Sequence, residues 1–177
     1  KLWDETRPSR STLYRYAREN NLMRDPHLTA VETVRPFEFP KFGQMWIADF
    51  MHGPKLYEGK KKRKSYLHLI IDDCTRYVVS GRFCSTESVQ SLILELMTAV
   101  RRHGIPHRLY TDNGSAYISR HLKIVCANLS MQQSHTPPGR PQGRSKVERF
   151  FRNVRQQFLA KKRYKTFDEI NTAFIAY

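Results

Sequence analysis

From about residue 42 onward, the chain carries short apolar segments that predict the strands of a sheet. Residues 45–51 are apolar except for one Asp, a pattern typical of a buried strand. Residues 66–71 and 77–84 predict two further strands. A basic turn at 59–64 separates the first strand from the second. Because the connections are short, the three strands are expected to form an antiparallel meander.

The following segment changes to helical periodicity. Thr86 is expected to cap a helix, which Gly104 and Pro106 end. Apolar side chains recur along this segment at the spacing of one helix face, at Val89, Leu92, Ile93, Leu96 and Val100. This pattern predicts an amphipathic helix packed on the sheet.

Short strands and helices then alternate to the end of the chain. Strands are expected at 108–111 and 131–135, on either side of a helix over about 119–129. A long helix is expected over 145–161, and another begins near 167. The resulting order, βββ-α-β-α-β-α-α, predicts an α/β fold in which helices flank a five-stranded mixed sheet.

The first forty residues differ from the rest. A basic helix is expected over about 12–20, with Ser9 or Ser11 as its cap, either as the end of a helix-turn-helix or as a packing helix. Residues 25–40 contain three prolines and predict a linker. The expected organisation is therefore an N-terminal helix and linker over 1–40, a core over 41–165 and a truncated helix over 166–177. The chain begins without Met and ends inside an apolar pattern, which suggests a fragment.

Charge narrows the class of partner. The chain has 31 Lys and Arg against 16 Asp and Glu, a net charge of +15 in 177 residues. Such an excess favours a polyanion, with nucleic acid first and an anionic membrane surface second. No run of 18 apolar residues occurs, so a transmembrane helix is not expected. The three widely spaced cysteines favour free thiols over disulfides or a zinc site.

Three acidic residues on separate elements are the candidates for chemistry. Asp49 interrupts the apolar strand at 45–51, Asp112 follows the strand at 108–111, and Glu148 lies on the long helix. Taken singly, they have structural alternatives: a capped or ion-paired Asp, a turn Asp, and a surface Glu paired with a nearby Arg. Taken together, carboxylates from three elements can converge on two Mg²⁺ ions. Such a pair stabilises the attacking and leaving oxygens of a displacement at phosphorus.

The three acids lie within longer motifs, WIADF at 46–50, YTDNGSAY at 110–117 and PGRPQGRSKVERFF at 138–151. Between Asp112 and Glu148 there are 35 residues. These motifs resemble the D,D-35-E pattern of the DDE transposase and retroviral integrase superfamily. The match is specifically to the integrase-type catalytic core of bacterial insertion-sequence or Mu/Tn7-like transposases, and it extends over roughly 42–165.

The resemblance implies an RNase H-like fold and a two-metal site. Asp49 would bridge two Mg²⁺ ions, for which Mn²⁺ can substitute, while Asp112 would hold one ion and Glu148 the other. The implied reactions are nicking at transposon 3′ ends and attack of the freed 3′-OH on target DNA, without a covalent protein–DNA intermediate. Implied partners are double-stranded DNA from the transposon ends and the target, and further copies of the chain on DNA; whether an ATPase selects the target is left open. Membranes are not among these partners, and the implied location is the nucleoid in a bacterial cytoplasm.

Three alternatives remain open at this point. A hydrolytic RNase H-like nuclease would use the same acids with water as its only nucleophile. A retroelement integrase would share the motifs. A non-enzymatic DNA-binding regulator would bind DNA without needing the acids.

Basic residues around the motifs are candidates for phosphate contacts. Between Arg140 and Lys165 there are ten Lys and Arg and one acidic residue. On the long helix, Val147, Phe151, Val154 and Phe158 are expected to face the core, beside a face that carries Glu148. The predicted DNA-binding residues are Lys60, Lys61, Lys62, Arg63, Lys64, Arg140, Gln142, Arg144, Lys146, Arg149, Arg152 and Arg155. Asp72 and Asp73 are expected to serve a turn or cap.

Overall fold

The computed structural model describes residues 9–20, 38–136 and 144–177. Contacts divide the chain into two units, 1–36 and 37–177. The described part of the first unit is helix α1 (Arg10–Glu19), whose cap is Ser9: its hydroxyl oxygen accepts the Thr12 N–H at 3.2 Å. The helix therefore begins two residues before the predicted start. Most of the predicted linker lies outside the described residues.

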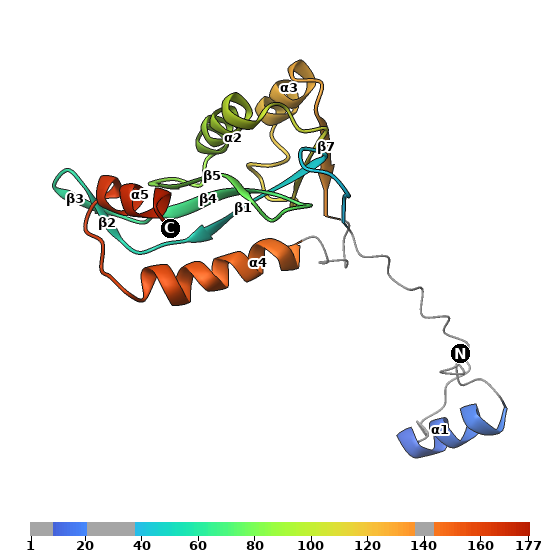
Figure 1. The fold of residues 1–177 in the computed structure, drawn as a ribbon. Helices are drawn as coiled ribbons and strands as arrows, with labels where there is room; N and C mark the ends of the chain where they lie inside the picture. The colour runs from blue at the N-terminus through green and yellow to red at the C-terminus, as the bar shows by residue number, and fades with distance from the viewer. Residues whose placement is uncertain (1–8, 21–37, 137–143) are drawn as a thin grey trace. The chain divides into compact units, whose positions relative to one another are not determined.

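The second unit is built on a five-stranded mixed sheet in the order β5-β4-β1-β6-β7 (Figure 1). Strand β1 is antiparallel to β4, β4 is antiparallel to β5, and β6 is parallel to both β1 and β7. The strands are β1 (Met45–His52), β4 (Tyr66–Asp72), β5 (Val78–Cys84), β6 (Arg108–Thr111) and β7 (Gln132–His135). The predicted sheet and its predicted strands are thus confirmed.

Strand β1 lies at the centre of the sheet, and both of its faces are buried. Alternate side chains point to opposite faces of a strand. Met45, Ile47 and Met51 enter one hydrophobic core, while Trp46 and Ala48 enter the other. This two-sided burial explains why the segment reads as an apolar run instead of an alternating pattern.

Helices cover both faces of the sheet. Helices α2 (Val89–His103) and α3 (Arg120–Asn128) pack into one core. Helix α4 (Arg144–Asn153), its π-helical continuation η2 (Val154–Leu159) and helix α5 (Phe167–Ile175) pack into the other. Figure 1 shows α4 beneath β1, with α2 and α3 on the opposite side of the sheet.

The ends of α2 test the predicted caps. The cap is Ser88, whose hydroxyl oxygen accepts the Ser91 N–H, so the predicted Thr86 cap is wrong. Thr86 precedes the helix, and its carbonyl oxygen bonds the His68 ring at 2.9 Å instead. The predicted end at Gly104 is confirmed: this residue has φ +82°, which glycine adopts without steric cost.

The long predicted helix is confirmed with one change of geometry. It begins at Arg144, and its last turn and a half, Val154–Leu159, is π-helical. The four side chains predicted to face the core are all buried, with exposed fractions of 0–5%, namely Val147, Phe151, Val154 and Phe158. This packing fixes the rotation of the helix, and it leaves Glu148 on the exposed side.

The predicted basic turn at 59–64 forms the turn and the second strand of a small hairpin, β2 (Leu56–Glu58) and β3 (Lys61–Arg63). Gly59 turns the chain between the strands with φ +60°. At the edge of the main sheet, α5 covers β5: the Asn171 amide accepts the Phe83 N–H and donates to the Phe83 carbonyl oxygen. In the described part of the chain, every helix is too short or too polar to cross a membrane.

Candidate active site

Asp49 occupies the middle of the central strand. Its parity matches that of Ile47 and Met51, so its side chain lies on the sheet face that α4 covers. Only 8% of the residue is exposed, and Oδ1 accepts the N–H of Phe50 at 2.8 Å. A carboxylate this deeply buried is stable only with partners or a bound cation, because desolvation of its charge is costly.

Asp112 directly follows β6, the strand that pairs in parallel with β1. The register joins Ile47 to Tyr110, and both side chains enter the same core. Extending this register by two residues along each strand would put Asp112 next to Asp49 on that face. The sequence separates these two acids by 62 intervening residues, so such an approach would be a product of the sheet.

The backbone after β6 holds Asp112 in place. Its Oδ1 accepts the Gly114 N–H at 2.8 Å, a local turn that orients the carboxylate. A Cβ at position 114 would lie 2.9 Å from that oxygen, so glycine fits there. The His135 ring on β7 lies 3.0 Å from both the Asp112 carbonyl oxygen and the Thr111 hydroxyl. Hydrogen bonds therefore restrain the backbone around the half-buried Asp112, just after the end of β6.

Glu148 lies on the first turns of α4, next to the buried Val147. The residue itself is exposed. In the described residues, no three His, Cys, Asp or Glu side chains gather closely enough to hold a metal ion. Over these residues, the three predicted acids therefore do not form a closed metal-binding cluster.

The donor set nevertheless suits a hard cation. All three predicted ligands are carboxylates, and Mg²⁺ prefers oxygen ligands while keeping several waters and substrate phosphate oxygens. Asp49 and Asp112 are the residues that would hold such an ion from the sheet. Glu148 would reach it from α4, the helix that covers the same face.

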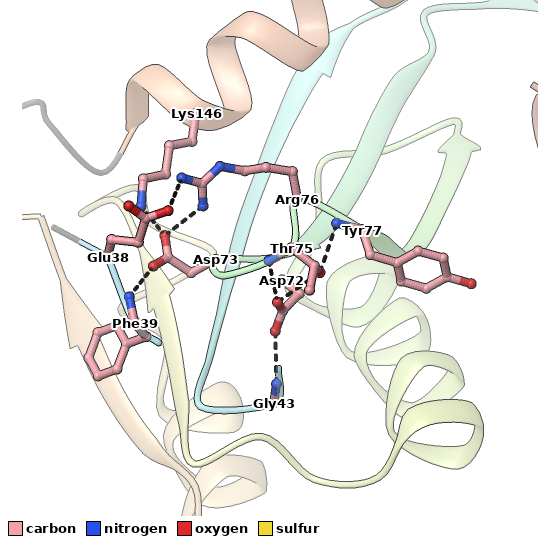
Figure 2. Close-up of polar contacts among 9 residues, drawn as sticks. All are labelled: Glu38, Phe39, Gly43, Asp72, Asp73, Thr75, Arg76, Tyr77 and Lys146. Atoms are coloured by element: carbon pink, nitrogen blue, oxygen red, sulfur yellow. Dashed lines mark hydrogen bonds and ion pairs between the residues drawn. The ribbon is translucent and has the colours of Figure 1, made fainter. Parts of the chain in front are cut away.

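Two further carboxylates, Asp72 and Asp73, lie at the end of β4 and are fully buried. Asp72 Oδ1 accepts the N–H and the hydroxyl of Thr75, both at 2.9 Å, and Oδ2 accepts the Gly43 N–H at 2.9 Å (Figure 2). These bonds close the turn between β4 and β5. The predicted turn role of Asp72 is confirmed.

Asp73 does more than close that turn. As Figure 2 shows, it joins three segments: its Oδ2 accepts the Phe39 N–H at 2.8 Å, and its Oδ1 pairs with the Lys146 ammonium and with Arg76 at 3.5 Å. Arg76 also pairs with Glu38 at 3.0 Å. Lys146 stands two residues before Glu148, so Asp73 anchors the first turn of the helix that carries the third acid. The separation of 73 residues leaves no sequence signal for this pair.

The predicted DNA-binding residues fall into three groups. Arg140 and Gln142 lie outside the described residues, as does the side chain of Arg144. Lys146 is largely buried against Asp73. The others are exposed, on the hairpin at Lys60, Lys61, Lys62, Arg63 and Lys64 and on the long helix at Arg149, Arg152 and Arg155.

Sequence reasoning missed four cations beside the hairpin. Lys55, Lys162, Arg163 and Lys165 line one groove together with Lys62. The basic run at 161–165 was visible in the sequence, but its pairing with the hairpin was not. The backbone makes this connection: the Tyr57 N–H donates to the Lys165 carbonyl oxygen at 2.7 Å.

The cysteines take no part in this site. All three are free thiols, as predicted. Burial raises the pKa of Cys126 to about 11, so the thiol stays protonated at neutral pH. Burial also raises the pKa of Cys84.

Residues 40–141 match the family described as Integrase core domain. Among named relatives, the transposase for transposon Tn552 of Staphylococcus aureus is 35% identical over 106 residues, which are 54% of this chain and 22% of that protein. The Gag-Pro-Pol polyprotein of sheep pulmonary adenomatosis virus is 28% identical over 136 residues, 72% of this chain and 8% of the polyprotein. The chain thus spans less than a quarter of the length of either relative.

Solved structures show the same fold. The simian T-cell lymphotropic virus intasome in complex with PP2A regulatory subunit B56 gamma superposes with a TM-score of 0.65 at 22% identity, over 77% of this chain and 48% of that one. The HTLV-2 integrase catalytic core domain in complex with magnesium, in its dimeric form, superposes with a TM-score of 0.52 at 24% identity. The superposition covers 72% of this chain and 77% of that chain. The fold is therefore the RNase H-like fold of integrase catalytic cores, as the sequence predicted.

Proposed function

The chain belongs to the Integrase core domain family, and from this premise we propose that it is the catalytic core of a DNA transposase. Its reaction nicks the transposon ends and then joins the freed 3′ ends to target DNA. The observation that supports the proposal is that β1, which carries Asp49, is the parallel neighbour of β6, which Asp112 follows, on a sheet with α4, the helix of Glu148, packed against one face.

The proposed reaction consists of two displacements at phosphorus. In the first, a water oxygen bonds to phosphorus while the bond from phosphorus to the 3′ oxygen breaks; the water loses one proton and the departing 3′ oxygen gains one, by way of solvent. In the second, the freed 3′ oxygen bonds to a target phosphorus while a target P–O3′ bond breaks, so the number of phosphodiester bonds is unchanged. Mg²⁺, when bound, would stabilise the charge on the attacking and leaving oxygens.

The chain's own residues have separate tasks in this scheme. Asp49 and Asp112 present carboxylate oxygens from adjacent strands, where the backbone N–H groups of Phe50 and Gly114 orient them. Glu148 presents its carboxylate from the exposed side of α4. Arg152 and Arg155, exposed further along the same helix, hold DNA phosphates in register.

Two transposon ends must be held together, so the proposal includes at least two copies of the chain on DNA. DNA and further copies of the chain are the only partners proposed, because no relative named above is described with an ATPase. In a bacterial host, such a protein would work at the nucleoid.

The proposal is tested by measuring whether the chain joins a DNA 3′ end to a second DNA duplex. A labelled duplex with a recessed 3′-OH is incubated with plasmid DNA and Mg²⁺ or Mn²⁺, using the wild-type chain and Asp49→Asn. We expect labelled plasmid only with the wild type. Cleavage without joining would favour the hydrolytic nuclease, and DNA binding with neither reaction would favour the regulator.

A retroelement integrase is the second candidate, because a retroviral polyprotein is among the relatives. It would perform the same joining reaction. The two candidates differ in the ends they accept, which a competition between bacterial inverted repeats and retroviral terminal sequences would measure. Preference for the retroviral ends would replace the transposase proposal.

A further inference from the structure

Two grooves lie beside the β2–β3 hairpin, and Tyr57 lines both. We call them the basic groove and the acidic groove. The basic groove, of about 420 Å³, lies between the hairpin and the chain that leads from η2 to α5. Its charged lining residues are all cations: Lys55, Lys62, Lys162, Arg163 and Lys165.

Most of this positive charge is uncompensated. Lys162 pairs with Glu169 at 3.0 Å. Over the described parts of the chain, no carboxylate lies within 4 Å of the other four cationic groups. Like charges this close repel one another, so a bound polyanion would relieve a cost that the fold otherwise carries.

The backbone around the basic groove is well tied. The Tyr57 N–H donates to the Lys165 carbonyl oxygen, and Tyr57 forms a parallel bridge with Thr166. The Lys165 N–H in turn donates to Glu169 Oε2 at 2.8 Å. In Figure 1 the hairpin and the start of α5 accordingly lie at the same end of the sheet. The cations are therefore carried on two segments that are held at a fixed spacing.

Aromatic rings add a second feature. Tyr57 is 45% exposed, and the Lys62 ammonium lies 5.8 Å from its ring centre. Tyr164 stacks on Phe158 of the core, with ring centres 4.9 Å apart. The Lys162 ammonium lies 5.5 Å from the centre of the Tyr164 ring. These contacts restrict the lysines, which lowers the entropy lost when they bind a phosphate.

The acidic groove provides the contrast. It is lined by three carboxylates, Glu58, Glu95 and Asp168, and one guanidinium, Arg82. A polyanion would be repelled there. The charge of the surface therefore reverses across Tyr57, which restricts a polyanion to one side of the hairpin.

We propose that the basic groove binds the phosphodiester backbone of duplex DNA, as a second contact beyond the catalytic acids. The proposal rests on the proposed function. Leu159, which lines the groove, comes eleven positions after Glu148. At the α-helical rise of about 1.5 Å per residue this is at most roughly 16 Å, because Val154–Leu159 is π-helical and rises less per residue. That length corresponds to about five base pairs at about 3.4 Å each. Arg152 and Arg155 are exposed on the intervening helix.

The experiment compares two triple variants that lose equal charge. One carries Lys55→Gln, Lys62→Gln and Lys165→Gln in the basic groove. The control carries Arg101→Gln, Arg102→Gln and Lys123→Gln, exposed on α2 and α3 across the sheet. Duplex DNA affinity is measured over a salt series, with thermal unfolding as a check on folding. Anionic phospholipid vesicles serve as the alternative polyanion.

Each phosphate contact contributes about 0.9 to the slope of log K against log[salt]. We expect the groove variant to lose up to about 2.7 of this slope and the control to keep it. Shortening the duplex by about five base pairs should remove the difference between wild type and groove variant. Equal loss in both variants, or a loss confined to vesicle binding, would overturn the proposal. If the wild type bound no DNA at all, the proposed function would fail first.

Discussion

Two groups of acidic side chains, on the sheet or on segments packed against it, differ in how deeply they are buried. We call Asp72 and Asp73 the turn acids, and Asp49, Asp112 and Glu148 the site acids. The turn acids are fully buried and bind donors 29, 34 and 73 residues away. Asp49 and Asp112 accept N–H groups one and two residues away, and Glu148 is exposed.

The difference separates a structural acid from a catalytic candidate. Bonds to distant segments make the turn acids part of what holds the fold, because breaking a buried, paired charge leaves its partner unsatisfied. Burial alone therefore does not identify a catalytic carboxylate, since the most buried acids here are the turn acids.

The sharpest test of the comparison is activity after neutralising one site acid. Asp49→Asn is expected to lower strand joining by at least about 10³-fold, because a metal ion supplies several kcal/mol of transition-state stabilisation and each 1.36 kcal/mol is tenfold in rate. The same loss is expected for Asp112→Asn and Glu148→Gln. The measurement is the initial rate of joining in Mg²⁺. A variant with wild-type rate would remove that residue from the site.

The turn acids should respond in the opposite way, mainly through stability. Asp73→Asn is expected to cost about 3 kcal/mol of unfolding free energy, because Lys146 is left without its buried partner. Asp72→Asn weakens bonds to Gly43 and Thr75 and is expected to cost about 1.5 kcal/mol. Urea unfolding measures both values.

The two turn-acid variants, Asp73→Asn and Asp72→Asn, also allow a matched comparison of activity at a temperature where both are folded. Asp73→Asn should lower the joining rate, since Lys146 begins the helix of Glu148, and Asp72→Asn should not. Equal rates in the two variants would show that the Asp73–Lys146 pair serves stability alone.

Arginines extend the comparison to DNA. Arg76 forms ion pairs with Glu38 and Asp73. Arg152 and Arg155 follow Glu148 in the chain and are exposed. The double variant Arg152→Ala and Arg155→Ala should reduce the salt slope of DNA binding by up to about 1.8 and leave stability nearly unchanged. Arg76→Ala should destabilise the fold and keep the slope. The reverse outcome would exchange the two roles.

The smallest expected effect is a thermal shift with Mg²⁺. A ligand at ten times its Kd stabilises the folded state by about 1.4 kcal/mol, a shift of a few degrees in Tm for a domain of this size. The shift should persist in Asp72→Asn and disappear in Asp49→Asn. If DNA is needed to complete the site, the shift appears only with a bound duplex. A shift that survives Asp49→Asn would place the ion elsewhere.

Some of these features could be predicted from sequence because they are local or periodic. The burial of Val147, Phe151, Val154 and Phe158 follows from helical spacing. The predicted cap of α2 is two residues too early, because Thr86 and Ser88 are both of residue types that cap helices, and the helix begins after Ser88.

The strands, the order of the elements and the three acids with their spacing could be read from the sequence, because these depend on local periodicity and on motifs. Contacts between distant segments could be read only from the folded chain. Parallel pairing makes β6, which Asp112 follows, the neighbour of β1, which carries Asp49, and an ion pair between residues 73 positions apart joins Asp73 to the helix of Glu148. The meeting of the hairpin with residues 162–165 was decided in the same way. Such contacts arise from packing between segments distant in the chain, which leaves no periodic trace in the sequence.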